Sequence, residues 1–338
     1  MRKTKRVESL GQYFACCCKC AGLSALIAGA ISLPASADTL SIGHTTWVGY
    51  GTLYLAQEKG FFEENGLDVE LPTFEGSSGY MSALASGDLQ GVAGTIAELV
   101  KYRSADFCFK AVVVLDDSYG GDGVVTESNV TSIHQLQGMT VGMNEGGASQ
   151  FWLSYLLRNN NLSLSDVNIQ NMSADAAAAA FIAGRIPVAV TWEPNLSFIR
   201  SHDRGHILVD SSETPGVIID VVALSCDVIE QRPDDVNALV KGLYKAVDYF
   251  KNNPQASYAL MAEGVGGYLE DPQDFAEATE GVRFYNESDN QDSIGNHDSP
   301  GNIADLVRVA RETWNEVEGS SLNTTYSDIV DPSFIHQP

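Results

Sequence analysis

The chain repeats one succession of predicted strands and helices. Each copy contains three short apolar strands, which are TLSIGHTT, LDVELPTF and LQGVAGT in the first copy and MTVGMNEGG, VNIQNMS and RIPVAVTWEP in the second. The separation of Gly43 from Gly87 nearly equals that of Gly142 from Gly184. Two copies of a unit this long exclude a solenoid. Because short strands that alternate with helices are typical of parallel sheets, the repeat predicts two similar α/β lobes.

Beyond Asp220 the repeat gives way to a helical pattern. The stretch from Arg232 to Pro254 carries apolar residues on one helical face, and proline is expected to close it. Later, ESDNQDSIGNHDSPGN (287–302) is polar and lacks periodicity, so it is predicted to be a loop.

Length and charge narrow the classes of protein that this chain can belong to. Its 338 residues exceed what one compact core usually holds, which again favours two lobes. The formal net charge is −24. Nucleic acids and anionic membranes are bound by clustered lysine and arginine, so this balance argues against nucleic acid or a membrane surface as a partner.

The first residues are typical of an export signal. MRKTKR is a basic start, AGLSALIAGAISL is an apolar core, and Ala35-Ser36-Ala37 is a small-x-small cleavage site. That apolar core is shorter than the roughly 20 residues needed to span a bilayer. We therefore expect residues 1–37 to be a signal peptide cleaved after Ala37, and the mature protein to be a periplasmic monomer.

The cysteines divide into two groups. Four of the six lie in the CCCKC run of the predicted signal peptide, where a metal-binding interpretation is weaker than removal with the signal. Cys108 and Cys226 remain in the mature chain. They could pair in an oxidising compartment or stay as buried free thiols.

The repeat also predicts where a ligand would bind. It places Thr95 and Trp192 at equivalent points, each at the carboxyl end of the third strand of its copy. Ligands of open α/β sheets bind outside the carboxyl ends of the strands. Trp192 and Glu193 are therefore predicted to form the wall of a cleft. The alternative is a tryptophan packed over the strand end beside a solvated glutamate.

Helix N-termini should face the same cleft, and their free N–H groups attract anions. The candidates in the first copy are the segment from Trp47 to Gly51, which includes Tyr50, the pair Ser77 and Ser78, and Thr95. Thr95 also begins a capping box with Glu98, which offers a purely structural role. In the second copy the candidates are the small residues Gly147 and Ser149.

Carboxylates supply the opposite polarity. Asp116, Asp117 and Asp122 surround Gly120-Gly121, and Asp220 interrupts the apolar run GVIIDVVAL. A lone acid in such a run is costly to bury unpaired, so Asp220 should meet either a ligand or an internal hydrogen-bond partner. No lysine or arginine occurs in the candidate cleft segments. Donors on one side and acids on the other suit a small zwitterion.

Motifs of catalysis are not found in the predicted mature chain. It has no HExxH, CxxC, GxSxG or P-loop sequence. His202 and His206 have metal-ligand spacing, but Gly205 interrupts them and predicts a turn. We therefore expect no enzyme activity, no cofactor and no metal.

Several stretches together resemble the substrate-binding proteins of ABC importers for sulfonates, taurine and nitrate, a group that includes binders of thiamine-pyrimidine precursors. These stretches are WVGYGTLYLAQEKGFFEENGLDVEL, GDLQGVAGTIAEL, LDDSYGGDGVV, VTWEPNLS and ALVKGLYKAVDYFKNNP. The resemblance implies a type II periplasmic-binding-protein fold of two α/β lobes joined by a hinge crossed twice, near 115–125 and 218–224. It implies that lobe one comprises 38–120 and 221–338, and that lobe two comprises 121–220.

The resemblance also implies a function. The protein would capture a small solute between its lobes and deliver it to an ABC permease and its ATPase subunits. Taurine or a related sulfonate fits the two-ended cleft, and a guanidinium-like cation or a thiamine-pyrimidine precursor is the alternative; an enzyme of the pyrimidine-synthase type is a further one. The predicted ligand-binding residues are Trp47, Tyr50, Ser77, Ser78, Thr95, Asp117, Gly147, Ser149, Trp192, Glu193 and Asp220.

Overall fold

The computed structural model describes residues 39–335, except residues 203 and 270. The predicted signal peptide and its four cysteines lie outside the described residues. Within the described part of the chain, none of the helices combines the length and the apolarity that crossing a bilayer would require.

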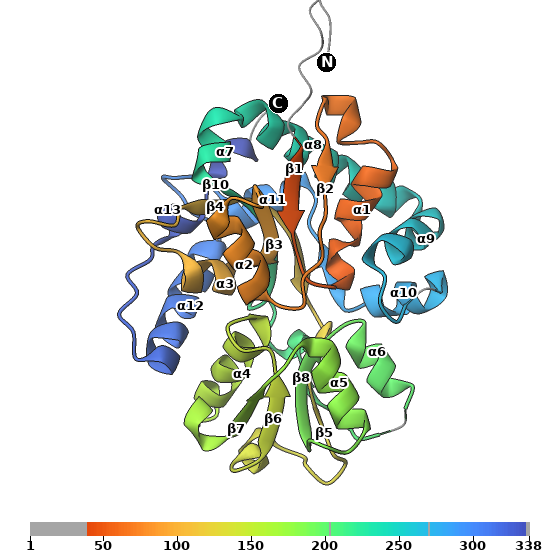
Figure 1. The fold of residues 1–338 in the computed structure, drawn as a ribbon, viewed down its shortest axis with the longest axis vertical. Helices are drawn as coiled ribbons and strands as arrows, with labels where there is room; N and C mark the ends of the chain where they lie inside the picture. The colour runs from red at the N-terminus through yellow and green to blue at the C-terminus, as the bar shows by residue number, and fades with distance from the viewer. Residues whose placement is uncertain (1–38, 203, 270, 336–338) are drawn as a thin grey trace, which may run out of the picture. The chain divides into compact units, whose positions relative to one another are not determined.

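One sheet has six strands in the order β11-β4-β10-β3-β1-β2 (Figure 1). The strand β1 pairs in parallel with β2 and β3, whereas β10 is antiparallel to β3 and β4, and β11 is antiparallel to β4. We call the part of the chain built on this sheet lobe one. Its strands are β1 (Leu40–Gly43), β2 (Val69–Glu70), β3 (Gly91–Thr95), β4 (Phe109–Ser118), β10 (Ile219–Ser225) and β11 (Val282–Phe284).

The other sheet has five strands in the order β7-β6-β8-β5-β9, and the part built on it is lobe two. Here β6 is parallel to β7 and β8, while β5 is antiparallel to β8 and β9. The trio β7-β6-β8 thus reproduces the trio β2-β1-β3, as the sequence repeat predicts. The strands are β5 (Asp122–Thr126), β6 (Thr140–Met143), β7 (Asn168–Asn171), β8 (Val188–Trp192) and β9 (His206–Asp210).

Helices cover the sheets, and several begin or end where local sequence signals predict. Thr95 forms a capping box with Glu98 at the start of α3, and Gly87 ends α2 in the left-handed conformation that glycine favours. Pro233 starts α8, whose apolar face is buried, and Pro254 starts the next helix. The helices of lobe one are α1 (Gly51–Glu58), α2 (Ser77–Ser86), α3 (Ile96–Tyr102), α7 (Cys226–Gln231), α8 (Pro233–Asn252), α9 (Pro254–Val265), α10 (Pro272–Thr279), α11 (Glu287–Ile294), α12 (Ile303–Glu318) and α13 (Tyr326–Ile329). Those of lobe two are α4 (Ala148–Asn159), α5 (Ala174–Ile182) and α6 (Asn195–Arg200).

The helix α11 contradicts the loop predicted for the first half of the polar stretch 287–302, whereas 295–302 contains neither helix nor strand, as predicted. Asn286 caps its start in a reciprocal pair with Asp289. The buried side chain of Asn290 bonds both backbone groups of Val114 in β4, accepting from its N–H at 2.7 Å and donating to its carbonyl at 3.0 Å. The helix is therefore fastened by polar groups, which a search for apolar periodicity does not detect.

The chain crosses between the two sheets twice. It leaves lobe one between Ser118 and Asp122 and returns between Asp210 and Ile219. The crossings lie side by side, because the hydroxyls of Ser118 and Ser211 are 2.8 Å apart. The chain thus crosses twice, as the family resemblance implies. The first crossing lies within the expected 115–125, but the second largely precedes the expected 218–224, because residues 219–225 form the strand β10 of lobe one.

The two cysteines of the described chain form a disulfide. Cys108 precedes β4 and Cys226 follows β10, with a sequence separation of 118. Of the two alternatives that the sequence leaves open, the structure has the disulfide. It joins the neighbouring strands β4 and β10 at the ends far from the hinge crossings.

We predict that the double variant Cys108→Ser/Cys226→Ser is less stable. Loss of a cross-link that closes a loop of this length is expected to lower the free energy of unfolding by about 2–4 kcal/mol. Urea denaturation should show a lower midpoint for the variant. A reducing agent should lower the midpoint of the native chain and leave the variant unchanged; equal midpoints for oxidised native protein and variant would contradict this expectation.

Candidate ligand-binding site

A pocket with an empty volume of about 370 Å³ lies where the two lobes meet at the carboxyl ends of β3 and β8. Both lobes contribute to its wall. The lining residues are Thr45, Trp47, Tyr50, Ser77, Thr95, Glu98, Asp122, Asn144, Ala148, Trp192, Ile218 and Asp220.

The structure brings together part of the residue set predicted from sequence. The predicted residues that line the pocket are Trp47, Tyr50, Ser77, Thr95, Trp192 and Asp220. The predicted residues that are not part of this lining are Ser78, Asp117, Gly147, Ser149 and Glu193.

Trp192 ends β8 as its position in the repeat predicts, and it is 8% exposed. Its indole Nε1–H donates to the carbonyl oxygen of Thr46 in lobe one at 2.7 Å. The tryptophan of one lobe is thus held by the backbone of the other, beside the pocket.

Asp220 and Asp116 lie on neighbouring strands and are paired in the register of β10 and β4. The hydroxyl of Tyr50 donates to Asp220 Oδ1 at 2.6 Å, and Trp47 Nε1–H donates to Asp116 Oδ1 at 3.1 Å. Asp116 Oδ2 is buried with no hydrogen-bond partner among the described residues. The partner that sequence analysis required for Asp220 is therefore a neutral tyrosine.

Two further carboxylates complete the acidic part of the wall. Asp122 Oδ2 accepts from Ser118 Oγ at 2.7 Å, and Glu98 Oε2 accepts from the backbone N–H of Thr95 at 2.7 Å. Sequence analysis noted Asp122 near the hinge and saw Glu98 only as a capping partner. Its place in a capping box at the end of β3 was the signal that could have assigned Glu98 to the site.

Burial without compensating cations raises the pKa values of these aspartates. Burial raises the pKa of Asp122 to about 7; Ser118 opposes the shift, and Glu98 and Glu193 add to it. The pKa values of Asp116 and Asp220 are raised well above the ordinary range, chiefly by burial, and that of Asp220 also by Asp116. No lysine or arginine is among the pocket-lining residues.

The N-termini of α2 and α4 reach the pocket from opposite lobes. Ser77 opens α2, Ala148 opens α4, and both line the wall. Ser77 Oγ lies 3.4 Å from Asn144 Oδ1, so the lobes touch at this edge. The first turn of each helix leaves backbone N–H groups without intrahelical partners, and these can donate to a ligand.

The predicted residues outside the lining have partners of their own. Glu193 accepts from the backbone N–H of Ser197 at 3.0 Å and forms an ion pair with Arg200, so it anchors α6. Asp117 accepts from the backbone N–H of Gly216 at 3.0 Å. Ser149 Oγ donates to the carbonyl of Val190, Ser78 is exposed, and Gly147 lies against lobe one.

Metal ligation finds no support in the arrangement of the described side chains. Within residues 39–335, leaving aside 203 and 270, no three His, Cys, Asp or Glu residues are grouped so that they could hold an ion.

Sequence comparisons relate the chain to binding proteins. The family model described as NMT1/THI5 like matches residues 47–257. A relative from Brucella abortus (strain 2308) is 25% identical over 213 residues, which are 62% of this chain and 66% of that protein. The taurine-binding periplasmic protein of Escherichia coli (strain K12) is 24% identical over 57% of this chain and 61% of its own length. The chain thus matches slightly less than two thirds of these relatives.

Structural comparisons agree on the fold. The alkanesulfonate-binding protein SsuA from Xanthomonas axonopodis pv. citri, solved with bound MOPS, superimposes with a TM-score of 0.71 at 15% identity, over 88% of this chain and 100% of that one. The desulfurization enzyme DSZB superimposes with a TM-score of 0.59 at 15% identity, over 88% of this chain and 97% of that one. The sheets, the double crossing and the matched segment lead to one conclusion: the chain has the periplasmic-binding-protein fold and belongs to the NMT1/THI5-like family.

Proposed function

We propose that this protein is the periplasmic solute-binding component of an ABC import system and that it captures a small nitrogenous cation. The observation that carries the ligand class is the pocket wall itself, where Glu98, Asp122 and Asp220 face the ligand space without a lysine or arginine. The names of the relatives and the predicted signal peptide support a binding and delivery role.

Two of these carboxylates can each accept a hydrogen bond from a ligand. Asp122 and Asp220 each have one oxygen bonded by a neutral protein donor. The second oxygen of each receives no hydrogen bond from a described residue. Burying a carboxylate without a counter-charge is costly, so a ligand cation with N–H donors would satisfy both the charge and the free oxygens.

Aromatic side chains complete the match. Trp47, Tyr50 and Trp192 line the same pocket as the carboxylates. Cations bind favourably over aromatic faces, and the small volume suits a flat, compact ligand. Guanidinium, an amidinium or an aminopyrimidine of the thiamine-precursor type has these properties.

Taurine is the second candidate, favoured by the N-termini of α2 and α4. They could receive the sulfonate while the carboxylates receive the ammonium. However, a Cβ placed on Gly147, at the start of α4, would lie 3.1 Å from Glu98 Oε1. A carboxylate therefore already lies at the end of the pocket where the sulfonate would bind, and this favours the cation over the zwitterion. A lone anion such as nitrate fits least well.

Contacts between the lobes beside the pocket support a mechanism of closure on the ligand. We call the contact of Gly76 and Ser77 with Asn144 and Gly147 the glycine seam. A Cβ on Gly147 would lie 2.6 Å from Ser77 Oγ, and one on Gly76 would lie 2.6 Å from Asn144 Nδ2. A Cβ on either glycine would require the side chains of Ser77 or Asn144 to shift.

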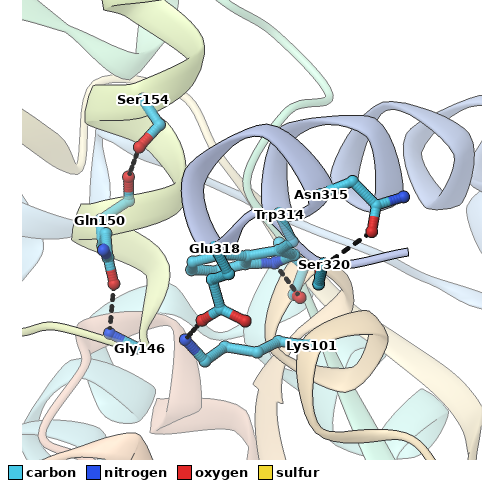
Figure 2. A network of polar contacts seen from close by, with 9 residues as sticks. Lys101, Gly146, Gln150, Ser154, Trp314, Asn315, Glu318 and Ser320 are labelled. Atoms are coloured by element: carbon cyan, nitrogen blue, oxygen red, sulfur yellow. Dashed lines mark hydrogen bonds and ion pairs between the residues drawn. The ribbon is translucent and has the colours of Figure 1, made fainter. Parts of the chain in front are cut away.

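Figure 2 shows polar contacts of Gly146, which precedes the seam residue Gly147, and of Lys101 in α3. Gly146 donates its backbone N–H to Gln150 Oε1 at 2.7 Å, which fixes the loop before α4. On the lobe-one side, Lys101 pairs with Glu318, and its ammonium also lies 4.3 Å from the ring centroid of Trp314.

A thermal-shift screen of the purified protein tests the ligand class. Guanidinium and a hydroxymethylpyrimidine should raise the unfolding midpoint, because a ligand at 1,000 times its dissociation constant stabilises the native state by about 4 kcal/mol. Urea, the uncharged isostere of guanidinium, is the control and should have no effect at the same millimolar concentration. If taurine alone raised the midpoint, the ligand would be a zwitterion and the proposed cation would be wrong. If nitrate alone raised it, both the cation and the zwitterion would be wrong.

Trp192→Ala should weaken binding of the best ligand from that screen at least tenfold, since the variant loses the ring beside the pocket. Titration calorimetry measures the change, and circular dichroism checks that the fold is retained. Trp192→Phe keeps an aromatic face while losing the hydrogen bond to Thr46, so it should bind better than the alanine variant. An unchanged dissociation constant for Trp192→Ala would mean that the residue serves packing only.

Gly147→Ala should weaken binding about tenfold, because its methyl group would keep the lobes apart at the glycine seam. The backbone of Gly147 has φ of −113°, which alanine adopts without strain, so lobe two itself should stay intact. Gly79→Ala is the matched control, since its Cβ would meet only Phe74 of the same lobe. If both variants bind alike, the seam has no part in closure.

A further inference from the structure

We infer that the pocket exchanges a proton for its ligand: the unliganded protein holds at least one proton among Asp116, Asp122 and Asp220, and the arriving cation displaces it into solvent. This inference rests on the proposed cationic ligand. It adds to the binding of the cation the release of a proton.

These three aspartates and Glu98 form one buried group. Asp116 and Asp220 are register partners on β4 and β10, Thr95 pairs with Asp220 across β3 and β10, and Glu98 bonds back to Thr95. Asp122 begins β5, four residues beyond the end of β4. Each of the four side chains is at most 6% exposed.

Their hydrogen-bond donors are all neutral. Trp47 donates to Asp116, Tyr50 to Asp220, Ser118 to Asp122, and Thr95 to Glu98. Asp116 Oδ2, which is wholly buried, has no partner at all among the described residues. Neutral donors orient a carboxylate but bring no positive charge, so the group as a whole lacks charge compensation.

The charged groups around the cluster do not supply that compensation. Asp122 is faced by Glu98 and by Glu193, whose negative charge is matched by its own ion pair with Arg200. Asp220 is faced by Asp116, Glu98, Asp122 and the hydroxyl of Tyr50. Asp116 is faced by Asp117 and Asp122, and the arginine that acts on Asp117 is Arg283. Glu98 is faced by the hydroxyl of Tyr80.

Neighbouring carboxyl groups in a low-dielectric site cannot all be ionised at once, so some of them retain their protons. Burial raises the pKa of Asp122 to about 7, which places its titration near neutral pH. A guanidinium or amidinium ion keeps its positive charge throughout that range. When it bonds the free oxygens, the carboxylic acid loses its proton to the buffer, and the net charge of the pocket is conserved.

The direction of the pH dependence follows from this exchange. Below about pH 7 the ligand must expel a proton, so the affinity for guanidinium should rise with pH, by up to tenfold per pH unit for each proton released, and level off above. The stability of the unliganded protein should depend on pH in the opposite direction. Its folded state binds more protons than the unfolded chain between the ordinary aspartate pKa and about 7, so its unfolding midpoint should fall as pH rises through this range.

Titration calorimetry with guanidinium at pH 6.5, in phosphate and in Tris, tests the exchange directly. A released proton is taken up by the buffer, and protonation of Tris is far more exothermic than that of phosphate. We expect a more exothermic apparent enthalpy in Tris, corresponding to release of about one proton per ligand. Clear binding with equal heats in the two buffers would overturn the exchange and leave the cationic ligand standing. Absence of binding in either buffer would overturn the proposed ligand class, and the exchange with it.

A pair of variants locates the proton. Asp122→Asn should bind guanidinium more weakly and should lose most of the difference between buffers and most of the pH dependence. The control, Asp248→Asn, changes an exposed aspartate on α8 and should behave as the native protein does. Should Asp122→Asn keep the full difference between buffers, Asp220→Asn and Asp116→Asn are tested next. Loss of the difference in either variant retains the exchange and assigns the proton to that aspartate, whereas its persistence in all three variants overturns the exchange.

Discussion

The pairing of β4 with β10 is the constraint on which the rest of the structure depends. The strand β4 is the last one before the chain crosses to lobe two, and β10 is the first one after the chain returns. The register of these antiparallel strands therefore fixes where lobe two is attached. The same register places Asp116 opposite Asp220, and it positions their indole and phenol donors around the pocket. The disulfide between Cys108 and Cys226 joins the other ends of the pair. The closeness of two of the buried acids of the site, Asp116 and Asp220, is thus a consequence of strand register.

Sequence reasoning predicted the duplicated part of the fold because its signals are periodic. The strand ends at Thr95 and Trp192 could be placed by counting within the repeat, and both line the pocket. The polar helix α11 could not be predicted in this way. It exists because Asn290 bonds the backbone of β4, and a contact between residues 114 and 290 leaves no mark in either local sequence.

The site residues that were missed were hidden by other roles or by weak signals. Glu98 satisfies a capping box, which explains its identity without any ligand, and Asn144 follows a strand with no pattern to distinguish it. Glu193 is the opposite case: it was predicted to bind the ligand and has protein partners, and its ligand role stays a prediction. Its position beside Trp192 suggested a ligand contact, but its carboxylate anchors the first turn of α6 and pairs with Arg200. Position along a strand predicts nearness to the pocket, whereas the direction of a side chain depends on the partners it meets, here Ser197 and Arg200 of the following helix.

The closeness of the two hinge crossings has a consequence for how such proteins diversify. Because the hydroxyls of Ser118 and Ser211 are in contact, the chain enters lobe two and leaves it at nearly the same point in space. Lobe two is therefore an insertion that could be replaced as one unit by recombination within the two crossings. The strand pairing of lobe one would stay intact. Such an exchange would replace one wall of the pocket, including Asp122, Asn144 and Trp192, and retain the other. New specificities could then arise by shuffling half-sites, without rebuilding the scaffold.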